Sequence, residues 1–296
     1  MIEIRELTKT YGGIDAVKDV TFTASPGRVT GFLGMNGSGK TTTLRVLLGL
    51  SRPTSGQALI NGRRYRDLGQ PLTQVGAVLE QGLSHPGQTG RGHLRTQAFL
   101  GGASGARVDE LLDYVGLADA GSKRTGDYSL GMRQRLAVAT AMLGDPAVLV
   151  LDEPANGLDP SGMAWLRQLL RGHAEAGGTV LISSHLLGEL EQLVDDVVII
   201  AGGRVRLAEP LAALTGRQAL RLRVRGRDPH ALWAAFEQAG AQVRTDGPVL
   251  HVSGLTPEDA GEIAFAVQQP IYELTSDAPT LEQLFFELAQ DNAAAG

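Results

Sequence analysis

The chain has 296 residues, of which 43% are apolar and 20% are charged, proportions typical of a globular protein with one large domain or one large and one small domain. Its formal net charge of −5 argues against a protein that coats nucleic acid, and the absence of cysteine excludes disulfides, thiol nucleophiles and cysteine-bound zinc. No apolar run approaches the roughly 20 residues that span a bilayer, and residues 1–5 lack a signal-peptide pattern, so we expect a cytosolic chain without its own transmembrane segment.

The first part of the chain is expected to consist mainly of short strands. Apolar runs bounded by glycine, proline and asparagine are typical of strands, and a glycine-rich stretch leads into one helix. The expected helix lies at residues 42–50, and the expected strands lie at residues 2–7, 20–24, 28–33, 57–60 and 74–79.

The middle of the chain changes to a helical pattern and then returns to strands. Residues 81–145 are predicted to form a helical subdomain. Two apolar runs, at residues 148–151 and 179–183, predict strands that are buried on both faces of a parallel sheet. Residues 197–201 and 204–207 flank two glycines and predict a hairpin.

A domain boundary is expected after residue 210. Residues 1–210 would form the first domain, residues 211–217 a linker, and residues 218–296 a small α+β domain. The order strand, helix, strand, strand, helix, strand in this last part predicts a ferredoxin-like arrangement, followed by a closing helix. Its strands are expected at residues 220–224, 242–245, 249–253 and 271–275, and its helices at residues 229–239, 257–268 and 281–290.

The motif G-x-x-x-x-G-K-[ST] occupies residues 34–41, after an apolar strand and before a helix. Its glycines let backbone N–H groups converge on phosphate oxygens, and the helix adds its positive N-terminal end. Lys40 would reach the β- and γ-phosphates, and the Thr41 hydroxyl would coordinate Mg²⁺. The predicted nucleotide-binding residues of this loop are Gly34, Asn36, Gly37, Ser38, Gly39, Lys40, Thr41 and Thr42.

A pair of carboxylates follows the apolar strand at residues 148–151. A strand that ends in Asp152 places this carboxylate beside the metal in P-loop ATPases, and Glu153 can then polarise a water for attack on the γ-phosphate. The sequence therefore predicts an ATPase that uses ATP and Mg²⁺.

With these motifs and the segment Tyr-Ser-Leu-Gly-Met-Arg-Gln at residues 128–134, the chain resembles the nucleotide-binding subunit of an ATP-binding cassette (ABC) transporter. The resemblance covers roughly residues 1–210 and implies an α/β P-loop ATPase cassette, with a mixed sheet core, an antiparallel β subdomain and a helical subdomain. It also implies that Ser129 and Gly131 bind the γ-phosphate of ATP held by a second copy. A hydroxyl, an amide and a helix N-terminus all favour an anion, which suits that role.

The same resemblance implies roles for three further residues. Tyr11 looks like the aromatic residue that stacks on adenine, Asp159 like part of the loop that communicates across the dimer, and His185 like the switch histidine that contacts the γ-phosphate. Glu80 or Gln81 would sense Mg²⁺ and the membrane partner, and register favours Glu80.

Several positions depart from the commonest family pattern. Met35 stands in place of proline, and Leu130 and Met132 stand in place of glycine and glutamine. These departures and the added C-terminal domain are similar to bacterial drug- and antibiotic-export ATPases that pair with a separate ABC-2-type permease. The segment at residues 272–288 is also similar to the end of that subgroup.

We therefore expect an ATP-hydrolysing subunit that energises export of a drug, antibiotic or other hydrophobic compound. Two copies would sandwich two ATP, and the pair would lie on the inner face of the plasma membrane, bound to a polytopic permease through residues 81–145. No nucleic-acid partner is expected. The alternatives are a soluble cassette ATPase that acts on ribosomes or DNA, and an importer ATPase. The role of the C-terminal domain stays open between dimerisation, permease docking and regulation.

Overall fold

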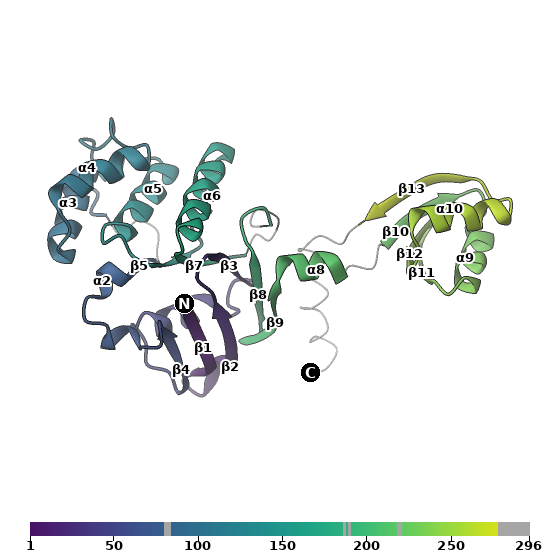
Figure 1. Ribbon diagram of the computed structural model, residues 1–296, viewed down its shortest axis with the longest axis horizontal. Helices are drawn as coiled ribbons and strands as arrows, with labels where there is room; N and C mark the ends of the chain where they lie inside the picture. The colour runs from purple at the N-terminus through teal and green to yellow at the C-terminus, as the bar shows by residue number, and fades with distance from the viewer. Residues whose placement is uncertain (80–83, 186–187, 189–190, 218–220, 278–296) are drawn as a thin grey trace. The chain divides into compact units, whose positions relative to one another are not determined.

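The computed structural model of the protein describes residues 1–79, 84–185, 188, 191–217 and 221–277 (Figure 1). The chain divides into two compact units, Met1–Pro210 and Leu211–Gly296. The predicted Glu80 and Gln81, and the closing helix expected at residues 281–290, lie outside the described residues.

The first unit is built around a six-stranded sheet with the strand order β5-β6-β7-β3-β8-β9. All neighbouring strands are parallel except β8 and β9, which form the predicted antiparallel hairpin. Every residue of β6 and β7 is buried, as their unbroken apolar runs predict for strands that are covered on both faces. The strands are β3 (Arg28–Leu33), β5 (Val75–Val78), β6 (Val148–Asp152), β7 (Thr179–Ser184), β8 (Asp196–Ala201) and β9 (Arg204–Pro210).

A second, antiparallel sheet has the order β2-β1-β4. The strands expected at residues 2–7 and 20–24 are longer than predicted, because β1 and β2 continue to a hairpin whose turn residues Gly12 and Gly13 both have positive φ. Three register shifts along this pair break the alternation of buried and exposed residues, which hid the ends of both strands. The strands are β1 (Ile2–Tyr11), β2 (Ile14–Ala24) and β4 (Ser55–Ile60).

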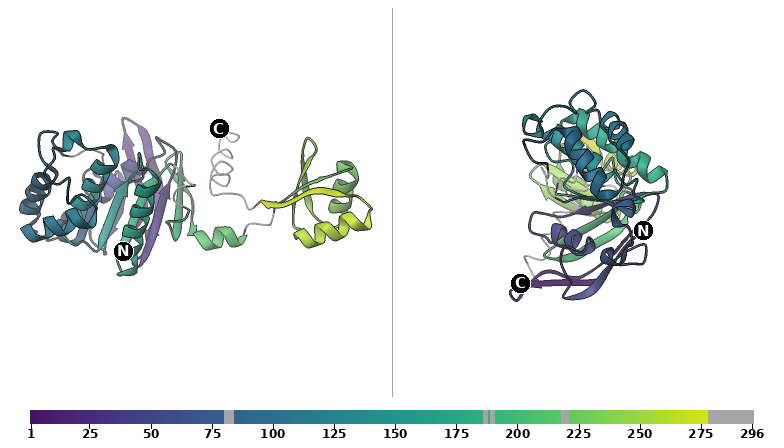
Figure 2. Two further views of the ribbon diagram at one scale, coloured as in Figure 1. Left: turned by 90° about the horizontal axis from the view of Figure 1, so that it is seen from above. Right: turned by 90° about the vertical axis from the view of Figure 1, so that its left-hand side faces the viewer.

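Helices complete the first unit, and three of them form the expected helical subdomain at one end of it (Figure 1; Figure 2, left). This subdomain has its own buried cluster, which includes Leu94, Leu112 and Leu136. Helix α6 joins β6 to β7 and was not predicted, and α1 begins two residues earlier than expected. The helices are α1 (Lys40–Leu47), α2 (Pro71–Gln74), α3 (Gly90–Gly101), α4 (Gly105–Tyr114), α5 (Leu130–Ala141) and α6 (Pro160–Glu175), with 3-10 turns η1 (Tyr65–Asp67) and η2 (Thr125–Asp127).

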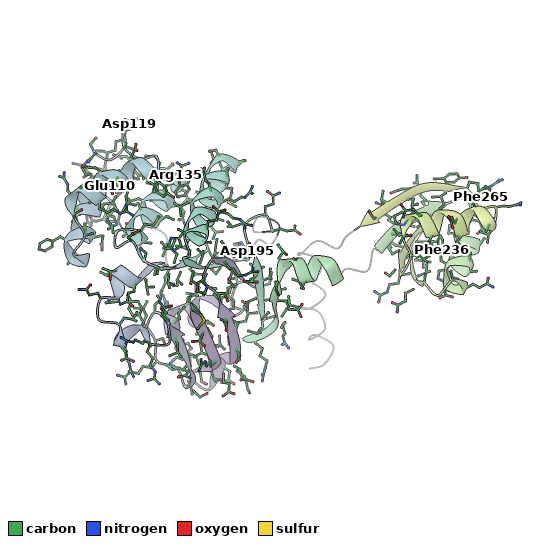
Figure 3. All side chains as sticks on the ribbon, in the orientation of Figure 1. Glu110, Asp119, Arg135, Asp195, Phe236 and Phe265 are labelled. Atoms are coloured by element: carbon green, nitrogen blue, oxygen red, sulfur yellow. The ribbon has the colours of Figure 1, made fainter. Side chains whose placement is uncertain are left out.

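The second unit has an antiparallel sheet with the order β11-β12-β10-β13, and its element order confirms the predicted ferredoxin-like arrangement. Residues 211–217, expected as a linker, form helix α8. The side chain of Phe236 is fully buried between helices and sheet, whereas Phe265 is 86% exposed (Figure 3). The elements are α8 (Leu211–Arg217), β10 (Arg221–Gly226), α9 (Pro229–Gln238), β11 (Gln242–Asp246), β12 (Val249–Ser253), α10 (Pro257–Ala266) and β13 (Ile271–Asp277).

Within the part of the chain that the structure describes, no helix combines the length and the apolar character needed to cross a membrane.

Candidate functional site

The loop between β3 and α1 has a backbone that only glycine tolerates at several positions. Gly37 and Gly39 have φ values of +81° and +108°. A Cβ atom on Gly34 would lie 2.5 Å from the Ile200 carbonyl oxygen, and one on Gly39 would lie 2.8 Å from the Ala16 carbonyl oxygen. The loop is thus held tightly against β2 and β8, and a side chain at Gly34 or Gly39 would push it away.

The side chain of Lys40 lies within this loop and is 5% exposed. Its ammonium group donates to the Gly34 carbonyl oxygen at 2.6 Å and lies 3.4 Å from the Met35 carbonyl oxygen. Ser38 is also buried, and its hydroxyl has no hydrogen-bond partner among the described residues. The loop therefore holds a buried cation and a spare hydroxyl, both of which suit an anionic ligand. Asn36 and Gly37 of the same loop are exposed, and of the first residues of α1, Thr41 is exposed and Thr42 is half-buried.

Asp152 lies at the end of β6, directly beside the start of α1. The Thr41 hydroxyl donates to Asp152 Oδ2 at 2.7 Å, and the Ser183 hydroxyl donates to Asp152 Oδ1. Ser183 comes from the neighbouring strand β7, so each oxygen of the carboxylate is held by a hydroxyl from a different element. Sequence reasoning did not identify Ser183, although two serines follow the apolar run of β7.

Glu153 follows Asp152 and has a φ of +51°, which places it in the left-handed region that few non-glycine residues adopt. Its N–H group donates to the Ser183 hydroxyl at 3.0 Å and to the Ser183 carbonyl oxygen at 3.2 Å. These bonds hold the backbone in this conformation. Glu153 Oε1 lies 3.2 Å from Lys40 Nζ, outside hydrogen-bonding geometry, so this contact is an ion pair only.

His185 lies one residue beyond β7 and contacts the second oxygen of the same carboxylate. His185 Nδ1 is 2.8 Å from Glu153 Oε2, and both side chains are partly exposed. The Glu153 carboxylate therefore has the Lys40 ammonium on one side and the His185 imidazole on the other.

Ser129 is exposed and forms the N-cap of α5, where its hydroxyl accepts the Met132 N–H at 3.2 Å. Asp159 forms the N-cap of α6 and accepts the Gly162 N–H at 2.7 Å. The Gly162 N–H and the Ser161 hydroxyl hold the pKa of the Asp159 carboxyl below its ordinary value. Both residues thus lie at the N-terminal end of a helix, where the helix dipole is positive.

Tyr11 lies at the end of β1 and is 49% exposed. Its hydroxyl lies 3.3 Å from Ser51 Oγ, and Lys9 Nζ lies 4.6 Å from the centre of its ring. One face of the ring is therefore next to a cation.

The structure brings together the loop, Lys40, Thr41, Asp152, Glu153 and His185 at the carboxyl ends of three adjacent strands, β6, β7 and β3. Ser129, Gly131 and Asp159 form a second group. Among the described residues, no hydrogen bond or ion pair joins that second group to the loop.

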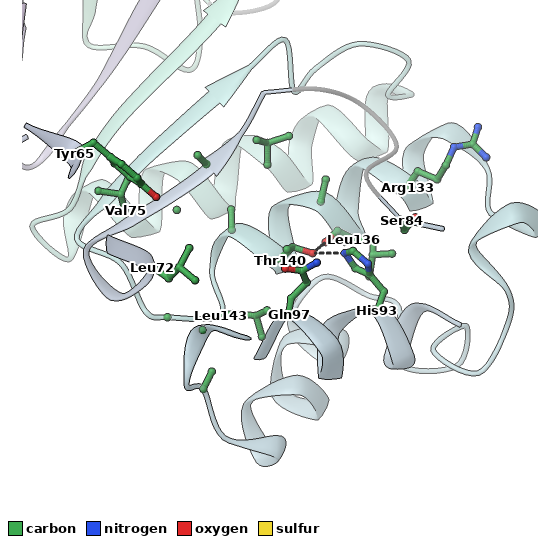
Figure 4. Close-up of a pocket in the computed structure, with 18 residues that line it drawn as sticks. Tyr65, Leu72, Val75, Ser84, His93, Gln97, Arg133, Leu136, Thr140 and Leu143 are labelled. Atoms are coloured by element: carbon green, nitrogen blue, oxygen red, sulfur yellow. Dashed lines mark hydrogen bonds between the residues drawn. The ribbon is translucent and has the colours of Figure 1, made fainter. Parts of the chain in front are cut away.

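A cavity of about 230 Å³ lies in the first unit between β5 and the helical subdomain (Figure 4). Its wall is mostly apolar and includes Leu72, Val75 and Leu136. Inside it, His93 Nε2 lies 3.1 Å from the Thr140 hydroxyl, which links α3 to α5.

Comparisons with known proteins show the family of the chain. The sequence family described as ABC transporter matches residues 17–156, and a domain of unknown function matches residues 220–282. The chain is 36% identical over 296 residues to the bacitracin transport ATP-binding protein BcrA of Bacillus licheniformis, and the match covers 97% of each chain. It is 33% identical over 207 residues to the lantibiotic transport ATP-binding protein SrtF of Streptococcus pyogenes, covering 70% of this chain and 90% of that protein.

The fold is similar to that of a dimeric ATP-binding cassette in a post-hydrolysis state bound to ADP and Pi. The TM-score is 0.64 at 25% identity, and the similarity covers 71% of this chain and 99% of that structure.

Proposed function

The chain belongs to the ATP-binding subunits of ABC transporters, as its similarity over nearly its whole length to a bacitracin transport ATP-binding protein shows. From this premise we propose how its residues hydrolyse ATP, and with which partner and cargo it works. It is an ATPase that binds ATP and energises a transporter.

The observation that carries the proposed mechanism is the placement of the Glu153 carboxylate between Lys40 and His185. The N–H groups of residues 34–39 and the Lys40 ammonium would hold the phosphates. Glu153 would accept a proton from the attacking water, and His185 would orient the Glu153 carboxylate and donate to the γ-phosphate as charge grows there. Tyr11 would stack on adenine at the edge of the same site.

The chain's own oxygen atoms suit Mg²⁺ as the metal. Thr41 and Asp152 offer a hydroxyl and a carboxylate within hydrogen-bonding distance of one another, and hard cations prefer such oxygens. Among the described residues, no group of three or more histidine, aspartate or glutamate side chains is arranged so that it could hold a metal ion. When bound, Mg²⁺ would neutralise charge on the phosphates. Glu80 or Gln81 stays proposed as a further ligand.

Two copies of the chain would complete each site. No hydrogen bond or ion pair among the described residues joins Ser129, Gly131 or Asp159 to the loop of their own chain. Ser129 and Asp159 are exposed, and their hydroxyl and carboxylate suit contact with another copy. We infer that Ser129 and Gly131 bind the γ-phosphate held by the second copy, and that Asp159 contacts that copy's loop.

The proposed partner is a separate polytopic permease at the inner face of the plasma membrane, and the proposed cargo is an antibiotic or another hydrophobic compound to be exported. The names of the similar transport proteins support this choice over a cassette ATPase that acts on ribosomes or DNA, and over an importer. We propose that the cavity between β5 and the helical subdomain receives an apolar cytoplasmic segment of that permease. Leu72 lines this cavity and is 49% exposed, and on α3, between the lining residues Gln97 and Gly101, Phe99 and Leu100 are 86% and 67% exposed.

The test of the mechanism is the variant Glu153→Gln, which keeps the size of the side chain but cannot accept the proton. We expect turnover to fall by about 100-fold or more, the usual contribution of a general base, while ATP binding is retained. Because bound ATP then persists, the variant should form a dimer in the presence of ATP, which size-exclusion chromatography with light scattering would measure.

Glu175→Gln is the matched control, because Glu175 is exposed on α6 and has no partner in the site. It should hydrolyse ATP at the rate of the unaltered chain. Undiminished hydrolysis by Glu153→Gln would refute the assignment of Glu153 as the base.

A further inference from the structure

Helices α5 and α6 begin side by side, although 30 residues separate their N-caps Ser129 and Asp159. Helix α5 belongs to the helical subdomain, whereas α6 connects two strands of the main sheet. The contacts between these two helix starts therefore decide whether Ser129 and Asp159 can move independently.

The first contact joins Leu130 to Gly157. A Cβ atom on Gly157 would lie 2.0 Å from Leu130 Cδ2 and 2.8 Å from Leu130 Cγ, so the leucine occupies the space where a side chain would stand. Gly157 also has a φ of +75°, which favours glycine at this turn. The Leu130 side chain thus packs directly against the backbone at Gly157, where only a residue without a side chain leaves room for it.

The second contact reverses this arrangement. Leu158, from the turn before α6, lies with its Cδ2 atom 3.7 Å from the Cβ position of Gly131 and 3.2 Å from that of Gly162. The leucine of each segment therefore packs against a glycine of the other, and close packing resists sliding between the two helix starts.

A third contact lies one to two turns further along both helices. The Arg135 guanidinium lies 4.8 Å from the centre of the Trp165 ring (Arg135 is labelled in Figure 3). Each residue is six positions after its own N-cap, and Trp165 packs against the buried cluster of the helical subdomain. The two helices are in register from their caps onward.

We propose that Leu130 is a positioning residue that locks the starts of α5 and α6 together, so that Ser129 and Asp159 meet a second copy as one rigid surface. This inference rests on the proposed function, in which both residues reach the other copy's nucleotide. Binding through one preformed surface costs less conformational entropy than ordering two independent segments. Leu130 itself touches no nucleotide in this scheme.

The first test compares Leu130→Ala with the unaltered residue, both in the Glu153→Gln background. We expect the dimer dissociation constant at saturating ATP to rise roughly tenfold, within the range of coupling between residues in contact. ATP affinity measured under monomeric conditions should not change, because Leu130 does not contact the nucleotide that its own chain binds. An effect of less than twofold on dimerisation would overturn the proposal, as would an equal loss of ATP affinity.

The second test is a double-mutant cycle with Gly157→Ala, which disturbs the same contact from the other side. Gly157→Ala alone should weaken the dimer, because its methyl group displaces Leu130. Added to Leu130→Ala, it should cost much less, since the displaced side chain is already gone. Gly157→Ala strains the backbone by the same amount with and without Leu130→Ala, so this strain cancels when the two effects are compared. Additive effects of the two substitutions on the dimer dissociation constant would overturn the proposal.

Two controls make the outcome specific. Leu130→Met keeps the volume and should restore dimerisation to within twofold, whereas Leu50→Ala, at a leucine that is 69% exposed, should change nothing. If Glu153→Gln alone forms no dimer with ATP, the proposed function fails. If Glu153→Gln does form the dimer and the added Leu130 substitutions do not weaken it, only the proposed role of Leu130 fails.

Discussion

Glu153 combines a catalytic assignment with an unfavourable backbone. Its φ of +51° costs roughly 1–3 kcal/mol for a non-glycine residue, and the two bonds from its N–H group to Ser183 offset this cost. The strained conformation turns the carboxylate toward Lys40 and His185 rather than along the direction of β6. A glycine would relieve the strain but remove the carboxylate.

At Asp152, we predict that Asp152→Asn lowers turnover by about 100-fold and raises the Mg²⁺ concentration needed for half-maximal activity, because an amide oxygen carries no charge to bind the cation. A titration of ATPase activity with Mg²⁺ measures both effects, and chelation with EDTA should stop hydrolysis by the unaltered chain. Asp113→Asn, at an exposed position on α4, serves as the control. Hydrolysis that continues in EDTA would contradict the proposed metal site.

The sequence indicated some contacts of the site but not others. The spacing of the two motifs anticipated that Thr41 and Asp152 would lie close together, and the structure joins them by a hydrogen bond. Ser183 could not be chosen in advance, because a serine at the end of a buried strand has many possible partners. The left-handed conformation of Glu153 was equally hidden, since glutamate has no preference for it. The catalytic and binding roles of these residues stay predictions.

At the scale of elements, the link between α3 and α5 has a predicted pH dependence. Burial lowers the pKa of His93 below its ordinary value of 6.5, so the folded chain binds this proton more weakly than the unfolded chain does. The contribution of His93 to stability is therefore complete above pH 6.5 and is lost as the pH falls toward the lowered pKa. Half-buried His173 on α6 also has a pKa lowered mainly by burial, and it adds to the same loss.

We expect His93→Gln, which can still bond to Thr140 but does not titrate, to lose less stability than the unaltered chain between pH 7.5 and pH 5.5. Urea unfolding followed by circular dichroism at both pH values measures the difference. His230→Gln, at an exposed histidine, should keep the full acid sensitivity. Equal losses in all three chains would contradict the assignment to His93.

Most elements followed from the pattern of apolar residues, and the exceptions have physical reasons. Helix α6 was missed although Asp159 and Pro160 form a helix start and Leu166, Leu169 and Leu170 are buried at helical spacing. The full length of β2 could not be read, because six of its eleven residues are exposed without strict alternation.

At the scale of the whole molecule, the proposed permease contact predicts a separation between hydrolysis and transport. Leu72→Asp places a charge at the rim of the cavity and should disrupt an apolar contact with the permease. We expect the isolated chain to hydrolyse ATP normally, while the amount of permease that co-purifies in detergent falls at least tenfold.

Tyr114→Asp is the matched control, because Tyr114 is 53% exposed in the helical subdomain beside the cavity but does not line the cavity. It should retain the permease. If both variants retain it equally, the cavity is not the docking site.

The order of strands in the main sheet has a consequence for the newly synthesised chain. The loop at residues 34–39, the carboxylates after β6 and the Ser183 hydroxyl on β7 come from segments that are about 150 residues apart, and they meet only when β7 inserts between β6 and β3. A ribosome-bound chain that ends before β7 carries the phosphate loop and both carboxylates, but it lacks Ser183, which holds the Asp152 side chain and the Glu153 backbone, and it lacks His185. The protein can therefore begin to consume ATP only after most of its first unit has been synthesised and folded.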